Sequence, residues 1–579
     1  MKIKRWIAPA MVALLTGCQT PGEQTYYDLL IENASIYDGL GSTAQAGEIA
    51  IIGDRIAYIG PDAPFQSKQV IDAHGLAVAP GFINMLSWSN EALFEDGTGE
   101  SSLRQGITLE VMGEGISMAP LTGPMAAALK AQQGEIQYDV NWRSLDEYFK
   151  EMERRGVAFN IASYAGAATV RMNVLGTDDV VPTDAQMQEM QDVVRDAMED
   201  GAMGVASSLI YPPGAFAETP ELTALASQSA KCGGIYATHM RSEGDRWIEA
   251  IEEAITIGRG SKAPLELFHL KVGGAKNFPK TTEALKMMDD ARADGVHLTA
   301  DMYVYNASGT TLAASIPPWV QDGGLDAMLG SLQDPDTRAK IIAEMKDPDA
   351  GWENVMELAG GPDNVMLAVA KSAELKPYLG MRVSEIAEAW GVSPEEAILD
   401  LILKEKGHPE AIYFTMSEDS IREIIQKPYV SFVSDGVAMA PEGVFLESGT
   451  HPRSYGNFSR VYAHYVRDEN LLSLPEAIRR MTSLPAGVLS LEDRGVLKEG
   501  NVADIVIFDP ETIQDKATYL EPHQFSVGVD AVIVNGQAAL QDGEPTGAMP
   551  GKALRGRAWS ERSDGGCRAS ADDWTWSDN

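Results

Sequence analysis

Two histidines each follow a short apolar run in the middle of the chain, in a setting that suits catalysis. Ile235–Thr238 precedes His239 and Leu265–Phe268 precedes His269, with a helical pattern between the two runs. A strand–helix–strand unit with a parallel, right-handed crossover brings both strand ends to one edge of the sheet. We therefore expect the two imidazoles to lie side by side at that edge. The alternative is that both are buried structural histidines.

Carboxylates follow two other strand-like runs. Glu114 stands after the second run of the large domain, in VMGEGIS, and Asp435 after the last, in FVSDG. Two imidazoles and a carboxylate are a ligand set of catalytic zinc, with water in the open position. A further carboxylate within reach serves as general base and acid. Each residue alone is weak evidence, because Glu-Gly and Asp-Gly are ordinary turn pairs.

Eight strand-like runs alternate with helical patterns, which predicts a parallel (β/α)8 barrel of the TIM type, an α/β fold. Capping boxes at Ser144 and Thr183 mark the starts of two of the helices. In such barrels the active site lies at the C-terminal ends of the strands. The runs are Phe82–Leu86, Thr108–Met112, Val157–Ser163, Met203–Leu209, Gly234–Thr238, Leu265–His269, His297–Met302 and Tyr429–Ser434.

The ends of the chain predict a second, smaller domain. Alternating apolar and polar residues at 28–80 and again at 486–555 are typical of half-buried antiparallel strands. We expect both stretches to build one β-sandwich around the barrel of residues 81–485, leaving 556–579 as a C-terminal tail. Residues from about 306 to 427 separate the last two barrel strands and are too many for a plain loop. An insertion there would overhang the strand ends as a lid.

The first residues are typical of an export signal. Lys2, Lys4 and Arg5 precede the apolar stretch Trp6–Leu15, which is too short to span a bilayer. Residues 15–18, Leu-Thr-Gly-Cys, resemble the lipobox of bacterial lipoproteins. This resemblance implies a lipoprotein signal peptide at 1–17, a lipidated Cys18 and a tether at 18–27. Because Gln19 follows the cysteine, it also implies an exported protein anchored in the outer membrane and facing the periplasm.

The composition of the chain makes one class of binding partner, nucleic acid, improbable. The 579 residues carry 46 basic and 84 acidic side chains, a net charge of −38, and 44% of residues are hydrophobic. Such a chain is globular, and its charge repels nucleic-acid phosphates, so we expect no nucleic-acid partner. Besides Cys18, only Cys232 and Cys567 remain, and nothing in the sequence indicates that they pair.

Several longer motifs stand along the chain: APGFI at 79–83, GISMAPL at 115–121, YPPG at 211–214, ATHMRSE at 237–243, His269-x-Lys271, SDG at 434–436, HPRSYGNFSRVYAHYVRD at 451–468 and RGVLKEGNVADIVIFDP at 494–510. They resemble motifs of the amidohydrolase superfamily and, within it, the N-acyl-D-amino-acid deacylases, or D-aminoacylases. The resemblance covers residues from about 28 to 555. It implies a β-sandwich with a zinc-bearing barrel, and hydrolysis of an amide to a carboxylate and a free amine.

The resemblance also implies residue roles. Glu114, His239 and His269 would bind one zinc ion per chain, and Asp435 would be the catalytic base and acid. Contacts to the substrate carboxylate would come from Tyr211, Lys271, Ser308 and Arg453. Arginine and lysine suit that role because the planar guanidinium of arginine and the compact ammonium of lysine both bind an anionic carboxylate.

Two departures from the family pattern concern the metal. The His-x-His pair expected at the end of the first barrel strand is replaced by Leu86 and Trp88, and Glu114 stands where these deacylases have a cysteine. Neither Leu nor Trp binds a metal, so we expect a variant with a single ion. Glutamate is a harder ligand than thiolate, so another divalent ion is the alternative to zinc.

The leading hypothesis is therefore a lipid-anchored zinc amidohydrolase that deacylates N-acyl-D-amino acids, small molecules. Two alternatives stay open. The same site would suit a dipeptide or a cyclic amide, and the loss of the histidine pair would suit an inactive ligand-binding lipoprotein. The oligomeric state is not indicated by the sequence.

Overall fold

The computed structural model describes residues 26–348, 350–559 and 567. The predicted signal peptide, Cys18 and nearly all of the predicted tether lie outside the described residues, as does most of the predicted tail. Among the helices described, none combines the length and the apolar character needed to cross a membrane.

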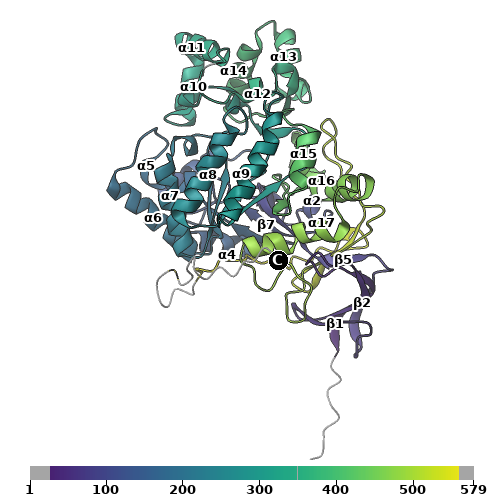
Figure 1. The fold of residues 1–579 in the computed structure, drawn as a ribbon. Helices are drawn as coiled ribbons and strands as arrows, with labels where there is room; N and C mark the ends of the chain where they lie inside the picture. The colour runs from purple at the N-terminus through teal and green to yellow at the C-terminus, as the bar shows by residue number, and fades with distance from the viewer. Residues whose placement is uncertain (1–25, 349, 560–566, 568–579) are drawn as a thin grey trace, which may run out of the picture.

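The large domain is a parallel barrel at the centre of the molecule (Figure 1). Each of the eight predicted runs overlaps one of its strands, so the barrel prediction is confirmed. The strands are β6 (Phe82–Ser87), β7 (Ile107–Met112), β8 (Asn160–Ser163), β10 (Gly204–Ser208), β11 (Ile235–His239), β12 (Leu265–Leu267), β13 (Leu298–Met302) and β17 (Val430–Phe432).

The strands form a closed ring although two breaks interrupt regular pairing. β8 pairs with β7, and after Tyr164 the chain continues as β9 (Ala165–Gly166), which pairs with β10. A parallel bridge between Ser87 and Gly436 joins the first strand to the last. All strand ends that carry candidate residues therefore face one side of the barrel.

The barrel helices begin where the sequence predicts. α4 (Leu145–Arg155) is capped by Ser144 and α6 (Asp184–Glu199) by Thr183, each through a complete capping box. Apolar residues of both helices, such as Tyr148 and Val194, are buried in the main core. The barrel is thus held by ordinary packing of amphipathic helices on strands.

Strands from both ends of the chain form the smaller domain, as predicted. They make one nine-stranded sheet in the order β21-β20-β19-β18-β5-β1-β2-β3, with β4 also paired to β1. The strands are β1 (Tyr27–Ile36), β2 (Gln45–Ile52), β3 (Arg55–Gly60), β4 (Ser67–Asp72), β5 (Ala77–Pro80), β18 (Ile505–Phe508), β19 (Val529–Val534), β20 (Gln537–Gln541) and β21 (Glu544–Pro545).

Side-chain alternation explains how this sheet joins the barrel. Ile505 and Ile507 of β18 lie in the small domain's own core, whereas Val506 and Phe508 lie in the main core, where Phe508 contacts Phe82. Because successive strand residues point to opposite faces, one strand stabilises both domains.

Two stretches of the predicted β region at residues 28–80 each contain two strands and a turn. Residues 48–60 form a hairpin, β2 and β3, that turns at Gly53, where φ is +59°. Residues 69–79 likewise divide into β4 and β5. The apolar and polar pattern indicates strands over both stretches but does not fix where one strand ends and the next begins.

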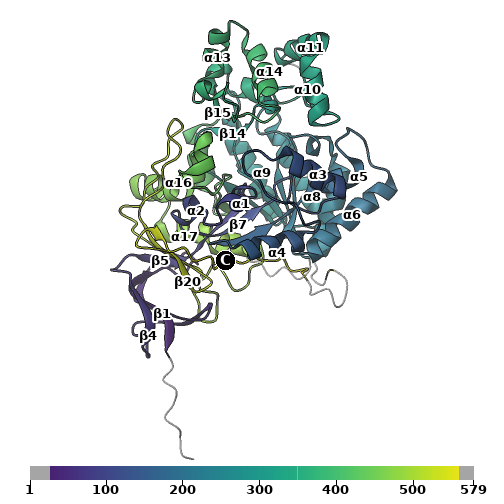
Figure 2. The same cartoon turned by 180° about the vertical axis from the view of Figure 1, so that it is seen from behind.

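Residues after β13 form a unit above the strand ends (Figures 1 and 2). Its three-stranded sheet has the order β14-β16-β15, and its core is separate from the main core. Helix α15 (Glu418–Ile425) then packs beside α9 (Thr281–Ala293) on the barrel. The elements of the unit are β14 (Ser308–Thr311), α10 (Leu325–Gln333), α11 (Pro335–Met345), α12 (Val355–Leu358), β15 (Val365–Val369), α13 (Val383–Trp390), α14 (Pro394–Lys404) and β16 (Glu410–Tyr413).

Cys232 and Cys567 form a disulfide across a sequence separation of 335 residues. Cys232 is fully buried at the end of α7 (Thr219–Lys231), immediately before β11 begins. The bond therefore ties the C-terminal region to the edge of the barrel opposite His239. No pattern in the sequence indicated this pair.

Candidate active site

Glu114, His239 and His269 converge at the C-terminal edge of the barrel. Nδ1 of His239 lies 2.9 Å from Nε2 of His269, and Oε1 of Glu114 lies 3.2 and 3.3 Å from these two nitrogens. All three side chains are buried. They form the one His/Cys/Asp/Glu group suited to a metal ion among the residues that the structure describes.

The three atoms fit a zinc ion. Tetrahedral ligands at zinc–ligand distances of about 2.0–2.1 Å lie roughly 3.4 Å apart, close to the separations found here. The second oxygen of Glu114, Oε2, is buried without a hydrogen-bond partner in the described part of the chain. Two imidazoles and a carboxylate at these spacings are therefore a set of donors that fits one tetrahedral cation.

The electrostatics of the cluster agree with that fit. Burial and Lys271 both lower the pKa of His269, but Glu243 and Glu114 outweigh them and raise it to about 10. Burial would raise the pKa of Glu114, yet the hydrogen bonds and charges of the two imidazoles hold it well below its usual range. The surroundings thus favour positive charge at this point, which a divalent ion supplies.

Glu243 is a functional candidate that the sequence reasoning missed. Its Oε1 lies 3.1 Å from Nδ1 of His269 and 2.5 Å from Nζ of Lys271. A carboxylate behind a ligating histidine fixes the ring and its tautomer. The signal that was available is its position four residues after His239, on the loop that continues from the strand.

Glu353, from the unit above the barrel, binds the loop that carries Glu243. Oxygens of the Glu353 carboxylate accept hydrogen bonds from the backbone N–H groups of Glu243 and Gly244, each at 3.0 Å, and from the Ser242 hydroxyl. Burial raises the pKa of Glu353, although these donors oppose the shift. The inserted unit therefore contacts the loop that carries Glu243, beside the cluster of Glu114, His239 and His269.

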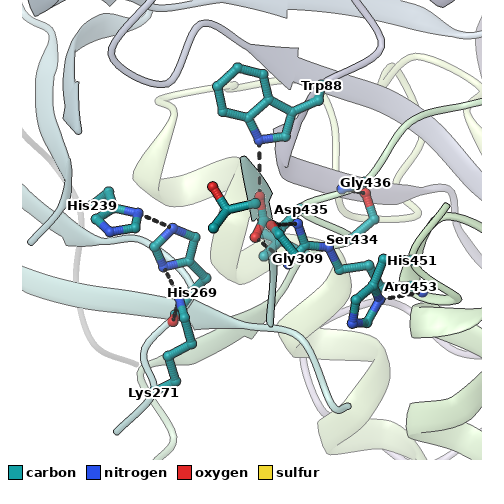
Figure 3. A network of polar contacts seen from close by, with 12 residues as sticks. Trp88, His239, His269, Lys271, Gly309, Ser434, Asp435, Gly436, His451 and Arg453 are labelled. Carbon is teal, nitrogen blue, oxygen red and sulfur yellow. Dashed lines mark hydrogen bonds and ion pairs between the residues drawn. The ribbon is translucent and has the colours of Figure 1, made fainter. Parts of the chain in front are cut away.

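Asp435 lies in the same cavity, immediately after β17. Its Oδ1 accepts a hydrogen bond from Nε1 of Trp88 at 3.0 Å, and its Oδ2 pairs with Nη1 of Arg453 at 2.7 Å (Figure 3). Its φ is +45°, a left-handed conformation that places the side chain out of line with the strand. The carboxylate is buried and held at both oxygens.

The four predicted substrate contacts lie around one cavity of about 720 Å³. Arg453 donates through Nη2 to the Gly309 carbonyl at 3.2 Å, and the hydroxyls of Tyr211 and Thr310 are 2.7 Å apart. The ammonium of Lys271, by contrast, points at Glu243 and at the ring and carbonyl of its neighbour His269. Arg453 is thus the cation that most directly faces the cavity beside Asp435.

The walls of this cavity come from two parts of the chain. Loops that follow the barrel strands contribute the candidate catalytic residues together with Ile116 and Met118, and the inserted unit contributes Val369 and Ile412. An apolar wall opposite a few convergent polar groups is typical of a small-molecule site.

A family model described as the amidohydrolase family matches residues 69–539. Two relatives from Alcaligenes xylosoxydans xylosoxydans align over nearly their whole length. N-acyl-D-glutamate deacylase is 32% identical over 535 residues, which is 92% of this chain and 97% of the relative. D-aminoacylase is 30% identical over 532 residues, 91% and 97% of the two chains. The chain belongs to the amidohydrolase superfamily, in its D-aminoacylase family.

Solved structures agree with this membership. The structure of N-acyl-D-glutamate deacylase from Bordetella bronchiseptica, complexed with zinc and a phosphonate inhibitor, is 31% identical and has a TM-score of 0.76. It covers 92% of this chain and 100% of that one. A D-aminoacylase structure is 29% identical with a TM-score of 0.75 and covers 91% and 100%. This amidohydrolase therefore has the barrel and β domain of its relatives.

The two residues in place of the expected histidine pair have different surroundings. Leu86 is fully buried in an apolar cluster of the barrel interior. Trp88 is 38% exposed, and its ring lines the cavity. In this amidohydrolase the end of the first strand therefore supplies an indole N–H donor to the cavity.

Proposed function

We propose that this amidohydrolase hydrolyses the amide bond of N-acyl-D-amino acids with a single divalent ion, zinc, bound by Glu114, His239 and His269. The observation that carries the proposal is the triangle of one carboxylate and two imidazole atoms, 2.9–3.3 Å on a side, in one cavity with Asp435 and Arg453. The D-configuration rests on the relatives, which are named for N-acyl-D-glutamate and D-amino acids.

Each residue has a defined task in this reaction. A zinc ion held by Glu114, His239 and His269 would polarise the amide carbonyl and lower the pKa of a bound water. Asp435 takes the proton of the attacking water and returns it to the amine nitrogen as the C–N bond breaks. The products are a carboxylate and a free amine. Glu243 holds the ring of His269 through Nδ1, so that Nε2 stays directed into the cluster.

The polar groups of the cavity orient the substrate in this proposal. Arg453 uses one N–H of Nη1 for Asp435 and one of Nη2 for the Gly309 carbonyl, and the second N–H on each nitrogen can bind an α-carboxylate. Tyr211 and Ser308 also line the cavity. Lys271 contributes positive charge from behind Glu243. The acyl chain then lies along the apolar wall.

We further propose that the protein is exported and anchored in the outer membrane through a lipidated Cys18. The residues that carry this proposal are the basic and apolar stretches before Cys18. The disulfide between Cys232 and Cys567 supports export, because disulfides persist in oxidising compartments such as the periplasm. Metabolic labelling with a fatty acid tests it: wild-type protein should carry label and Cys18→Ser should not.

A hydrolysis screen tests the proposed activity. Purified protein is offered N-acetyl-D- and N-acetyl-L-amino acids, a dipeptide and a cyclic amide, and its metal content is measured by mass spectrometry. We expect one zinc per chain, release of free D-amino acid, and loss of activity with a chelator that zinc restores. Bound zinc without turnover of any substrate would contradict the reaction, and absence of bound metal would favour a ligand-binding protein.

A further inference from the structure

We propose that Trp88 is a positioning residue for Asp435, so that an indole N–H orients the catalytic carboxylate in this enzyme. This inference rests on the proposed function of the same site. Trp88 stands where the family pattern has a histidine, and its Nε1 donates to Oδ1 of Asp435 at 3.0 Å (Figure 3).

The backbones on both sides of this hydrogen bond are fixed to each other. The N–H of Trp88 donates to the Gly436 carbonyl at 2.8 Å, and the N–H of Asp435 donates to the Leu86 carbonyl at 3.0 Å. These bonds belong to the seam where the first barrel strand meets the last. Donor and acceptor are therefore positioned by the closure of the barrel rather than by a mobile loop.

The hydrogen bond completes a clamp on the carboxylate. Rotation about χ2 of aspartate is only weakly restricted by its own torsional preference, so neighbours must set the orientation. Trp88 holds Oδ1 and Arg453 holds Oδ2. Each carboxylate oxygen accepts more than one hydrogen bond. A lone pair on Asp435 therefore stays available for a proton while the group cannot turn away.

The exposure of Trp88 indicates that packing alone does not explain the presence of a tryptophan at this position. Leu86, two residues earlier, is fully buried among apolar side chains, but Trp88 is 38% exposed to the cavity. An indole with an open face could donate to water, yet its N–H is directed at a charged carboxylate. Such charge-assisted hydrogen bonds are roughly twice as strong as neutral ones.

A second consequence concerns metal stoichiometry. Across the residues described, only the cluster of Glu114, His239 and His269 offers three ligating side chains. Asp435 is instead held by nitrogen donors at both oxygens. We therefore expect excess zinc to leave both the bound stoichiometry and the turnover of the enzyme unchanged.

The test compares Trp88→Phe with Trp319→Phe. The control is matched: Trp319 also donates Nε1 to a carboxylate, that of Glu344, at 3.0 Å, is 36% exposed, and does not line the cavity. With the best substrate of the hydrolysis screen, we expect kcat of Trp88→Phe to fall about tenfold, with KM within about twofold and one zinc retained. Trp319→Phe should match wild type in all three.

A second measurement does not depend on activity. The indole N–H resonance of Trp88, identified by its absence from the spectrum of Trp88→Phe, should move when Asp435→Asn removes the charge of its acceptor. An unmoved resonance would overturn the hydrogen bond, and an unchanged kcat in a folded Trp88→Phe would overturn the positioning role. An inactive wild-type enzyme would instead contradict the proposed function, since the resonance can still be followed.

Discussion

The carboxylate of Glu243 and the ring of His269 form a contact of 3.1 Å, at the Nδ1 atom on the far side of the ring from Nε2, which faces Glu114. The histidine is thus held between two carboxylates, one within the cluster and one behind it. A ligand supported in this way presents a single nitrogen to a cation in a fixed direction.

Glu243→Gln should weaken metal binding. The amide keeps the size of the side chain but removes the negative charge that supports His269 and pairs with Lys271. We expect zinc affinity to fall about 10–100-fold, measured by competition with a chromogenic chelator. Glu249→Gln, on the exposed side of α8 (Trp247–Ser261), is the control and should bind as wild type does. Equal affinities would show that Glu243 does not support the ligand.

Asp435→Asn should separate metal binding from turnover. The variant keeps the shape and the Trp88 contact but cannot accept the proton of the attacking water. We expect one zinc per chain and a kcat lower by about 10²–10⁴-fold, the usual contribution of a general base. Metal content and initial rates measure the two effects. Turnover near the wild-type rate would exclude Asp435 as the base.

Arg453→Lys should impair recognition of the substrate carboxylate. The guanidinium reaches Asp435 and the Gly309 carbonyl with two different nitrogens, which one ammonium cannot reproduce. We expect kcat/KM to fall about 100-fold, with a clear rise in KM. Arg467→Lys is a control outside the cavity, where the side chain pairs with Asp468. If KM stays unchanged, the substrate carboxylate binds elsewhere.

Cys567→Ser should lower stability without changing turnover. The disulfide closes a long loop, and loss of such a bond usually costs about 2–4 kcal/mol of the free energy of unfolding. Cys232 lies before β11, at the barrel edge opposite His239, so the active site keeps its geometry. Denaturant unfolding with and without reductant measures the effect. A variant as stable as wild type would show that the bond does not constrain the chain.

His451 should make the fold sensitive to acid. Burial and the charge of Arg453 lower its pKa well below the usual value. The ring stays neutral: Nδ1 accepts a hydrogen bond from the backbone N–H of Arg453 at 3.0 Å, and Nε2 donates to the Ala307 carbonyl at 2.9 Å. Because the unfolded state takes up the proton first, this stability is present above about pH 6.5 and is lost as pH falls below it.

The comparison of wild type with His451→Asn measures this loss. Asparagine retains a donor and an acceptor but does not titrate. Below about pH 6.5 the free energy of unfolding of wild type should fall more steeply, by up to about 1.4 kcal/mol per pH unit. Parallel pH profiles would contradict a neutral, buried His451.

The sequence revealed those parts of the molecule that follow from local periodicity. Barrel strands are apolar runs between helical patterns, so their number and order could be predicted. Because parallel strands end at one edge, the approach of Glu114, His239 and His269 followed without knowledge of any distance. The hairpin at Gly53 was not predicted, because the pattern of apolar residues does not fix where one strand ends and the next begins.

Contacts that depend on barrel closure or on loop paths could not be predicted in this way. The Trp88–Asp435 hydrogen bond joins residues 347 positions apart and exists only because the last strand meets the first. Glu243 lies on a loop whose direction the strand pattern does not fix. The pairing of Cys232 with Cys567 joins residues 335 positions apart, and no local pattern in the sequence indicates it.

The unit between β13 and β17 has its own sheet and its own core, and it still forms part of the cavity wall through Val369 and Ile412. Mutations there can reshape the pocket while the cluster of Glu114, His239 and His269 and the packing of the barrel stay as they are. Natural variation in substrate preference within this lineage should therefore accumulate in that module, and laboratory evolution for new acyl groups should begin there.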